Sequence, residues 1–133
     1  PVGSLLCGSR DFVARARRIR KLFGGGMRQA GILAAAGLHA LDHHVERLAE
    51  DHTRAANFAA ELADLEGVEI RRPPETNIVI FSAKDVPRLY AAARERGLLL
   101  SLMDASTLRV VTHLGVGDAD MGRALEILKE ALG

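Results

Sequence analysis

The order of apolar and polar residues divides the chain into a helical first part and a mixed second part. In residues 10–23 the apolar side chains recur at helical spacing, and Ser9 before them is a suitable N-cap. Gly24, Gly25 and Gly26 end that pattern, because three glycines cost about 3 kcal/mol relative to alanine inside a helix. Residues 27–65 then read as helix almost throughout, so the first half of the chain is predicted to be helical.

The long helical stretch changes character part-way along. Its first segment, "AGILAAAGLHAL", is apolar on nearly every side, which is typical of a helix buried against other protein. The next segment, "VERLAEDHTRAANFAAELADL", has one apolar stripe with charges opposite, and Gly67 is the expected stop. The stripe contains Val45, Leu48, His52, Ala55, Ala59, Leu62 and Leu65. This stretch is therefore expected to connect the second half to a further body of protein.

The second half alternates strand and helix patterns. Strands are predicted at "VEIRR", "NIVIFSA", "LLLSL" and "LRVVTHL", and helices at "DVPRLYAAARERG", with Asp85 as its cap, and "GDADMGRALEILKEALG". This order predicts a small, mainly antiparallel sheet with helices on one face, an α+β arrangement. The apolar run "SLLCG" at residues 4–8 suits one more buried strand, with Cys7 as an inert core thiol.

Composition supports a globular, soluble chain without a polyanionic partner. Apolar residues make up 48% of the 133 residues, which suffices for a core, and the net charge is only +1. The single cysteine excludes an internal disulfide framework and points to a reducing, cytoplasmic compartment. No apolar run approaches the roughly 18 residues that span a bilayer, so no membrane association is expected.

A basic helix and a glycine-rich segment are the first candidate sites. Residues 10–21 contain six basic side chains and one acid. No aromatic side chain that could stack on bases interleaves with the basic run at residues 15–21, so a solvated helix face is favoured over nucleic-acid binding. The glycines at 24–26 are flanked by Lys21 and Arg28, and a glycine loop before a helix can bind phosphate. The segment matches neither phosphate fingerprint, and its spacing favours a hinge.

Histidines and one arginine complete the candidates. The five histidines lack a carboxylate or cysteine partner at ligand spacing, so no metal site is predicted. Arg109 interrupts the apolar strand "LRVVTHL", where an unpaired guanidinium is costly. Either an internal acid pairs with it, or an incoming carboxylate does, since its planar fork grips a carboxylate through two parallel hydrogen bonds. The local sequence leaves both alternatives open.

Three passages together resemble one family. "PVGSLLCGSRDFV", "RKLFGGGMRQAGILAAAGLHAL" and "LRVVTHL" resemble the C-terminal part of the low-specificity L-threonine aldolases, within the aromatic β-eliminating lyase and threonine aldolase group of pyridoxal-phosphate (PLP) enzymes. The resemblance implies the α/β class of a fold-type I PLP enzyme. Residues 1–44 would be the last large-domain strand with bridging helices, and residues 45–133 the small C-terminal domain.

The same resemblance implies an activity and roles for three residues. It implies cleavage of L-threonine or L-allo-threonine to glycine and acetaldehyde by a cytoplasmic homotetramer, a dimer of dimers. Arg109 would bind the substrate α-carboxylate, and Lys21 and Arg28 would lie near the PLP site, across a subunit interface. The family's PLP-binding lysine precedes "PVGS", so no catalytic residue is expected in this chain, which would be inactive without its own N-terminal large domain.

Two other functions stay open at this stage. One is another β-eliminating amino-acid lyase of the same fold. The other is a non-catalytic α+β module that binds a carboxylate ligand through Arg109.

Overall fold

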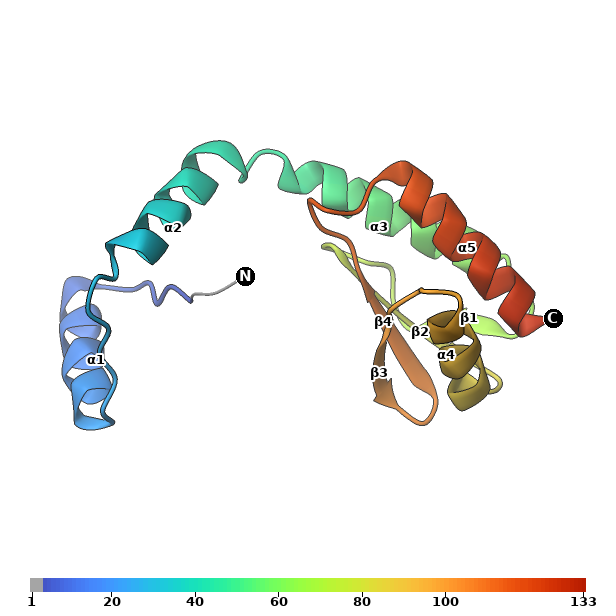
Figure 1. The fold of residues 1–133 in the computed structure, drawn as a ribbon, viewed down its shortest axis with the longest axis horizontal. Coiled ribbons are helices and arrows are strands. Elements are labelled where there is room, and N and C mark those ends of the chain that lie inside the picture. Colours follow the sequence, from blue (N-terminus) through green and yellow to red (C-terminus); the bar gives the residue numbers. More distant parts are fainter. Residues whose placement is uncertain (1–3) are drawn as a thin grey trace. The chain divides into compact units, whose positions relative to one another are not determined.

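The computed structural model describes residues 4–133, and the chain divides into two compact units, Pro1–Val45 and Glu46–Gly133 (Figure 1). The first unit contains the helices α1 (Arg10–Leu22) and α2 (Gly31–His43). The second unit contains, in chain order, α3 (Leu48–Ala63), β1 (Val68–Ile70), β2 (Ile78–Ala83), α4 (Val86–Glu95), β3 (Ser101–Asp104), β4 (Thr107–Val111) and α5 (Asp118–Leu132).

Both ends of α1 lie where the sequence predicts them. At the start, Ser9 Oγ accepts a hydrogen bond of 3.3 Å from the Phe12 amide. At the end, the Gly24 amide donates to the Lys21 carbonyl and the Gly25 amide to the Arg20 carbonyl, at 3.0 and 2.8 Å. Gly24 has a φ of 77°, so the pattern is a Schellman C-cap. The glycine triplet therefore ends a helix.

Gly25 also meets a steric requirement in this cap. A Cβ at Gly25 would lie 2.6 Å from Arg20 Cγ and 2.8 Å from the Arg20 carbonyl oxygen. No side chain fits at that distance, because the turn packs directly against the last turn of α1.

The apolar helix α2 forms as predicted, but the described residues do not bury it. Ile32, Leu38 and Leu41 are 78%, 63% and 58% exposed, and α2 contains no buried residue. The first unit by itself therefore does not provide the burial of this helix that the sequence predicts. None of the helices in residues 4–133 has the length and apolarity to cross a membrane.

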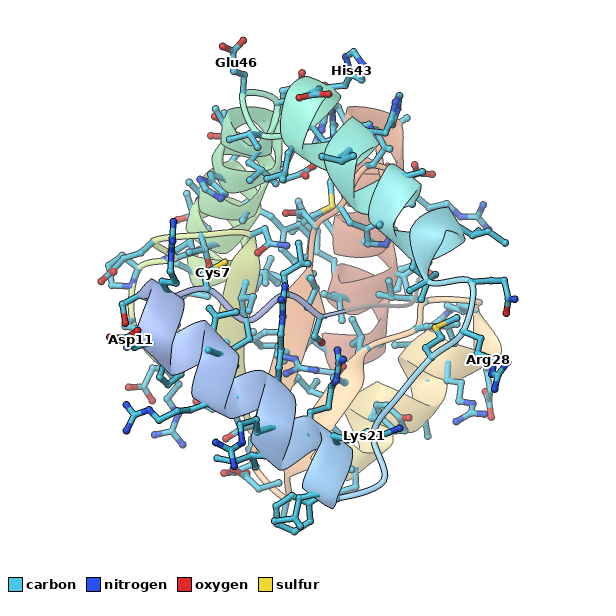
Figure 2. All side chains as sticks on the ribbon, turned by 90° about the vertical axis from the view of Figure 1, so that its left-hand side faces the viewer. Cys7, Asp11, Lys21, Arg28, His43 and Glu46 are labelled. Atoms are coloured by element: carbon cyan, nitrogen blue, oxygen red, sulfur yellow. The ribbon has the colours of Figure 1, made fainter. Side chains whose placement is uncertain are left out.

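The strand predicted at residues 4–8 is absent, and this prediction is wrong for the described chain. Residues 4–9 have no regular structure, and Leu5 and Leu6 are 76% and 64% exposed. Cys7 is likewise an exposed free thiol rather than a core residue (Figure 2). The physical reason is that a strand needs a hydrogen-bonded neighbour, and the four paired strands all belong to the second unit.

The second unit is a four-stranded sheet in the order β1-β2-β4-β3, and every pair is antiparallel, as predicted. Because side chains alternate along a strand, Val79, Phe81 and Leu108 point to one face, where they are completely buried. On the other face lie Ile78, Ile80, Arg109 and Val111, which are only partly buried or exposed. We call this second face the open face of the sheet.

The helices α3, α4 and α5 cover the buried face of the sheet and complete one core. Phe58 and Leu62 of α3, Leu89 of α4 and Leu128 of α5 are all at most 2% exposed. The predicted cap of α4 is confirmed, since Asp85 Oδ1 accepts a hydrogen bond of 3.1 Å from the Arg88 amide. The arrangement of helices on one face of an antiparallel sheet is therefore confirmed.

Two local predictions need correction. The strand predicted at residues 98–102 begins later, as β3 (Ser101–Asp104), because its pairing with β4 fixes the register and the side chain of Asp104 closes a tight turn with Ser106.

In α3 the predicted apolar stripe is buried only in its later part. Leu48 is 45% exposed, whereas Asp51 is 3% exposed, because two arginines pair with the Asp51 carboxylate.

Candidate functional site

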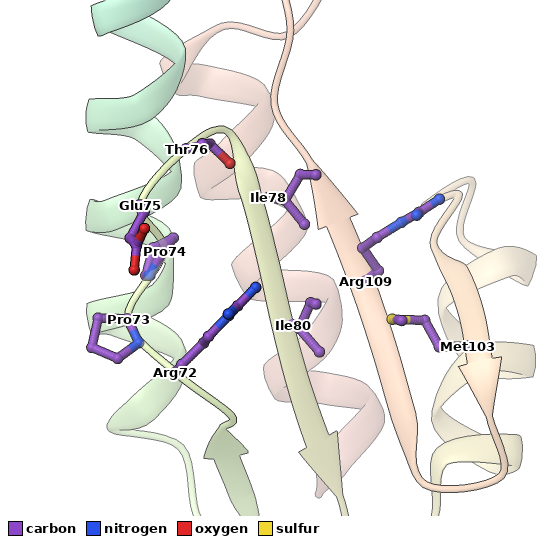
Figure 3. Close-up of a pocket in the computed structure, with 9 residues that line it drawn as sticks. All are labelled: Arg72, Pro73, Pro74, Glu75, Thr76, Ile78, Ile80, Met103 and Arg109. Atoms are coloured by element: carbon purple, nitrogen blue, oxygen red, sulfur yellow. The ribbon is translucent and has the colours of Figure 1, made fainter.

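Arg109 lies on the open face, near the middle of β4. Its backbone pairs with Ile80 of β2 on one side and with Ser101 of β3 on the other. The guanidinium is directed toward β3, where Nη2 donates a hydrogen bond of 3.4 Å to Ser101 Oγ (Figure 3). The strand therefore fixes which face the arginine occupies, and Ser101 fixes the direction of its head group.

Within residues 4–133, the Arg109 guanidinium has no acidic partner. No carboxylate of the described chain lies within 4.0 Å of it. Its Nε is buried and has no hydrogen-bond partner. A buried, unsatisfied donor on a charged group is costly, and a site that binds an anion is a common reason for such a donor.

A pocket of about 230 Å³ opens beside Arg109 on the same face. Ile78 and Ile80 of β2 and Met103 of β3 form its apolar floor, as Figure 3 shows. The connection from β1 to β2, residues 72–76, forms its rim. The rim also brings the Arg72 guanidinium and the Glu75 carboxylate to this pocket, so two cations and one acid line it beside the apolar floor. This lining suits a small molecule that carries one carboxylate and a short aliphatic part.

Lys21 lies in the last turn of α1, and Arg28 lies in the segment that joins α1 to α2 (Figure 2). The Lys21 ammonium reaches back over the glycines, since Nζ lies 3.9 Å from the point that a Cβ of Gly26 would occupy. Among the described residues, neither cation makes a salt bridge. Because the Gly24 and Gly25 amides are used inside the C-cap, an anion at this segment would be held by these side chains rather than by those amides.

The three predicted site residues are divided between the two units. Lys21 and Arg28 belong to Pro1–Val45, and Arg109 belongs to Glu46–Gly133. Lys21 and Arg28 are exposed, whereas Arg109 is partly buried.

Two charged groups of the second unit have shifted pKa values. A hydrogen bond of 2.7 Å from Arg54 Nε to Asp118, with nearby Glu50 and Asp51, raises the pKa of Arg54. Hydrogen bonds from the amide and hydroxyl of Ser106 lower the pKa of Asp104. Both contacts are structural, because the first joins α3 to the start of α5 and the second closes the β3–β4 turn.

The histidines do not form a metal centre in the part of the chain that the structure describes. No group of three or more His, Cys, Asp or Glu side chains there is arranged to hold a metal ion. His39 and His43 lie on successive turns of α2, with ring centroids 4.5 Å apart and ring planes tilted by 51°.

A family model of β-eliminating lyases matches residues 1–86, which is more than half of the chain. The chain belongs to the β-eliminating lyase family. The low-specificity L-threonine aldolase of Escherichia coli K12 is 43% identical to this family member over 87% of the chain and 34% of the E. coli protein. Low-specificity L-threonine aldolase 1 of Arabidopsis thaliana is 35% identical over 99% of the chain and 38% of the plant protein. The chain thus spans about a third of the length of the curated relatives it matches.

Solved structures of this lyase fold agree with the observed architecture. A candidate L-allo-threonine aldolase from Listeria monocytogenes superposes with a TM-score of 0.61 at 20% identity, over 92% of this chain and 37% of that protein. A mutant of C-DES with glycine covalently linked to its PLP cofactor superposes with a TM-score of 0.63 at 21% identity, over 78% of this chain and 29% of that one. The fold is therefore that of a part of fold-type I PLP enzymes, as expected.

Three residues near Arg109 are not evident from local sequence patterns. Ser101 and Met103 border the arginine only because the β3–β4 hairpin places them there, and Thr112 is buried through a contact with α3. A correct hairpin register would have indicated Ser101, since cross-strand partners lie opposite each other. The contact of Thr112 spans 61 residues of sequence, and no local pattern contains it.

Proposed function

We propose that this lyase-family chain is the C-terminal part of a PLP-dependent threonine aldolase that cleaves L-threonine or L-allo-threonine to glycine and acetaldehyde. The observation that carries the proposal is the Arg109 guanidinium, which lacks an acidic partner among the described residues and stands beside a small apolar pocket on the open face. Relatives 35–43% identical to the chain are named low-specificity threonine aldolases, which supports this choice of reaction.

In this proposal Arg109 holds the substrate α-carboxylate. Its fork donates two parallel hydrogen bonds to the carboxylate, and Ser101 keeps the head group oriented. A carboxylate held at one fixed point restricts rotation of the amino acid about Cα. Arg109 therefore contributes by orienting the Cα–Cβ bond that breaks, which is a positioning effect.

Lys21 and Arg28 are the residues of this chain proposed to hold the PLP phosphate. Their fit rests on the donor set, because neither cation has an acidic partner in the described residues. The turn between them is open at Gly24, where a Cβ would meet no atom within 4 Å. PLP, when bound, supplies an electron sink for the bond cleavage. The PLP-binding lysine and the large domain are proposed to precede Pro1, in a cytoplasmic homotetramer that assembles as a dimer of dimers.

The test uses the full-length protein. Arg109→Ala is expected to raise KM for threonine about a hundredfold, since about 3 kcal/mol of charge-assisted hydrogen bonding is lost, while the PLP absorbance stays unchanged. Lys21→Ala and Arg28→Ala are expected to weaken PLP binding instead. Arg88→Ala, on the exposed surface of α4, is the matched control and should alter neither quantity. Loss of PLP from Arg109→Ala at unchanged KM would contradict the carboxylate role.

A second reaction is favoured by one comparison, because the cystine C–S lyase C-DES superposes with a TM-score of 0.59 at 22% identity, over 76% of this chain and 28% of that one. The products distinguish the two reactions. An aldolase releases acetaldehyde and glycine from threonine, whereas a β-eliminating lyase releases a 2-oxo acid and ammonia from a β-substituted amino acid. A non-catalytic carboxylate-binding module would bind an amino acid and release neither set of products.

A further inference from the structure

Thr112 ties the end of β4 to helix α3. It follows the last residue of β4, three positions after Arg109, and its side chain is completely buried. Its hydroxyl donates a hydrogen bond of 2.7 Å to the backbone carbonyl of Asp51 in α3. A carbonyl inside a helix already accepts the amide four residues later, so Thr112 uses the second lone pair of that oxygen.

Asn77, which directly precedes β2, holds Thr112 from the neighbouring strand. The Thr112 amide donates to the Asn77 carbonyl at 2.9 Å, and Asn77 Nδ2 donates to the Thr112 carbonyl at 2.7 Å. The amide, the carbonyl and the hydroxyl of Thr112 therefore all have partners. We call Thr112, Asn77 and Asp51 the β4 anchor.

The acceptor end of the anchor is itself held firmly. The Asp51 carboxylate is 4% exposed and lies 3.5 Å from Arg47 and 3.4 Å from Arg54. Arg54 also bonds to Asp118 at the start of α5, at 2.7 Å. The part of α3 that receives the Thr112 hydroxyl is thus cross-linked within its own helix and to α5, so it is a fixed reference for the end of β4.

The β4 anchor adjoins both sides of the Arg109 pocket. On one side, Thr112 ends the strand that carries Arg109. On the other side, Asn77 immediately follows Thr76, the last residue of the pocket rim. A shift of either segment would change the distance between the guanidinium and a ligand carboxylate, and hydrogen bonds weaken steeply outside a range of a few tenths of an ångström.

We propose that the β4 anchor is a positioning device for amino-acid binding, in which Thr112 and Asn77 hold the strand and the rim so that Arg109 meets the substrate carboxylate. This inference rests on the function proposed above for Arg109. Thr112 is buried on the helix side of the sheet and acts through Arg109, so it is a positioning residue rather than a catalytic one.

The test compares two Thr→Val substitutions in the full-length protein. Thr112→Val keeps the shape of the side chain and removes the donor, and it is expected to raise KM for threonine about fivefold to tenfold, with kcat within twofold and PLP absorbance unchanged. Thr112→Ser restores the hydroxyl and is expected to restore KM. Thr53→Val is the matched control, because Thr53 also donates to a carbonyl of α3, that of Ala49 at 2.9 Å, but on the exposed side.

A second variant covers the case in which Thr112→Val fails to fold. Asn77→Ala removes the bond to the Thr112 carbonyl and is expected to raise KM in the same way, without loss of PLP. Unchanged KM in both variants, with only a lower melting temperature, would overturn the inference, as would an equal effect of Thr53→Val. An unchanged KM in Arg109→Ala would instead refute the proposed function, so the two failures are distinguishable.

Discussion

The stability of the chain is expected to depend on Phe81 and hardly at all on Phe23. Phe81 of β2 is 0% exposed, packs in the core of the second unit and pairs with Leu108 of β4. Phe23, at the C-cap of α1, is 84% exposed. The same substitution at the two positions therefore separates loss of core packing from loss of a surface side chain.

The size of the effect follows from burial. Replacement of a completely buried phenylalanine by alanine costs about 3–5 kcal/mol, because transfer free energy is lost and a cavity remains. The free energy of unfolding of a unit of about 90 residues is about 4–13 kcal/mol, so Phe81→Ala removes a large part of it. Phe23→Ala is expected to cost less than about 0.5 kcal/mol.

Urea unfolding of the 133-residue chain, followed by tyrosine fluorescence, measures this difference. The sequence contains one tyrosine and no tryptophan, and Tyr90 packs against the core, so the signal reports on the second unit. Phe23 belongs to the first unit, so Phe23→Ala should leave this midpoint unchanged. With a slope of about 1.5 kcal/mol/M, Phe81→Ala should lower the midpoint by about 2–3 M. Equal midpoints for Phe81→Ala and Phe23→Ala would refute the assignment of the core. If Phe81→Ala does not fold, Phe81→Leu, expected to cost about 1 kcal/mol, gives the same comparison.

The remaining predictions concern two glycines and one carboxylate, and the same unfolding assay measures them. Gly67 has a φ of 80°, which strains any other residue, so Gly67→Ala should lower the free energy of unfolding by about 1 kcal/mol. Gly122 lies inside α5, and a Cβ there would meet no atom within 4 Å. Gly122→Ala should therefore raise the free energy of unfolding by about 0.5–1 kcal/mol. Equal effects of the two would contradict this assignment of backbone conformation. The bonds from Ser106 lower the pKa of Asp104, so its ionised form adds stability above the unfolded pKa of about 4, and this contribution is lost as pH falls through the folded pKa. Asp104→Asn should therefore reduce the loss of stability in acid, and an unchanged pH profile would argue against these bonds.

Much of the fold could be predicted from local patterns because its causes are local. Ser9 and Asp85 cap helices through hydrogen bonds that reach only three residues ahead. Gly24 ends α1 because a positive φ is cheap only for glycine. The β-branched and apolar runs in the second half predicted the strands, and their order among the helices predicted the antiparallel sheet.

Where the local rules fail, distant contacts are responsible. Residues 4–8 are apolar enough for a strand, but no described strand pairs with them. Asp51 lies in a charged stretch that predicts exposure, and the neighbouring arginines together with Thr112 explain why it is buried. The start of β3 is displaced by three residues, because strand register depends on the partner strand rather than on hydrophobicity alone.

The sequence by itself determined the family, both ends of α1, the cap of α4, and Arg109 as the charged residue that an apolar strand has to accommodate. Only the tertiary structure decided that this guanidinium faces the open side of the sheet, above a small apolar pocket, with Ser101 beside it and the β4 anchor behind it. The physical reason is the sequence separation of the residues whose contacts decide each feature. Caps and turns are set by hydrogen bonds a few residues apart, whereas the position of Arg109 depends on hydrogen bonds that join residues up to 61 positions apart, and these exist only once the chain has folded.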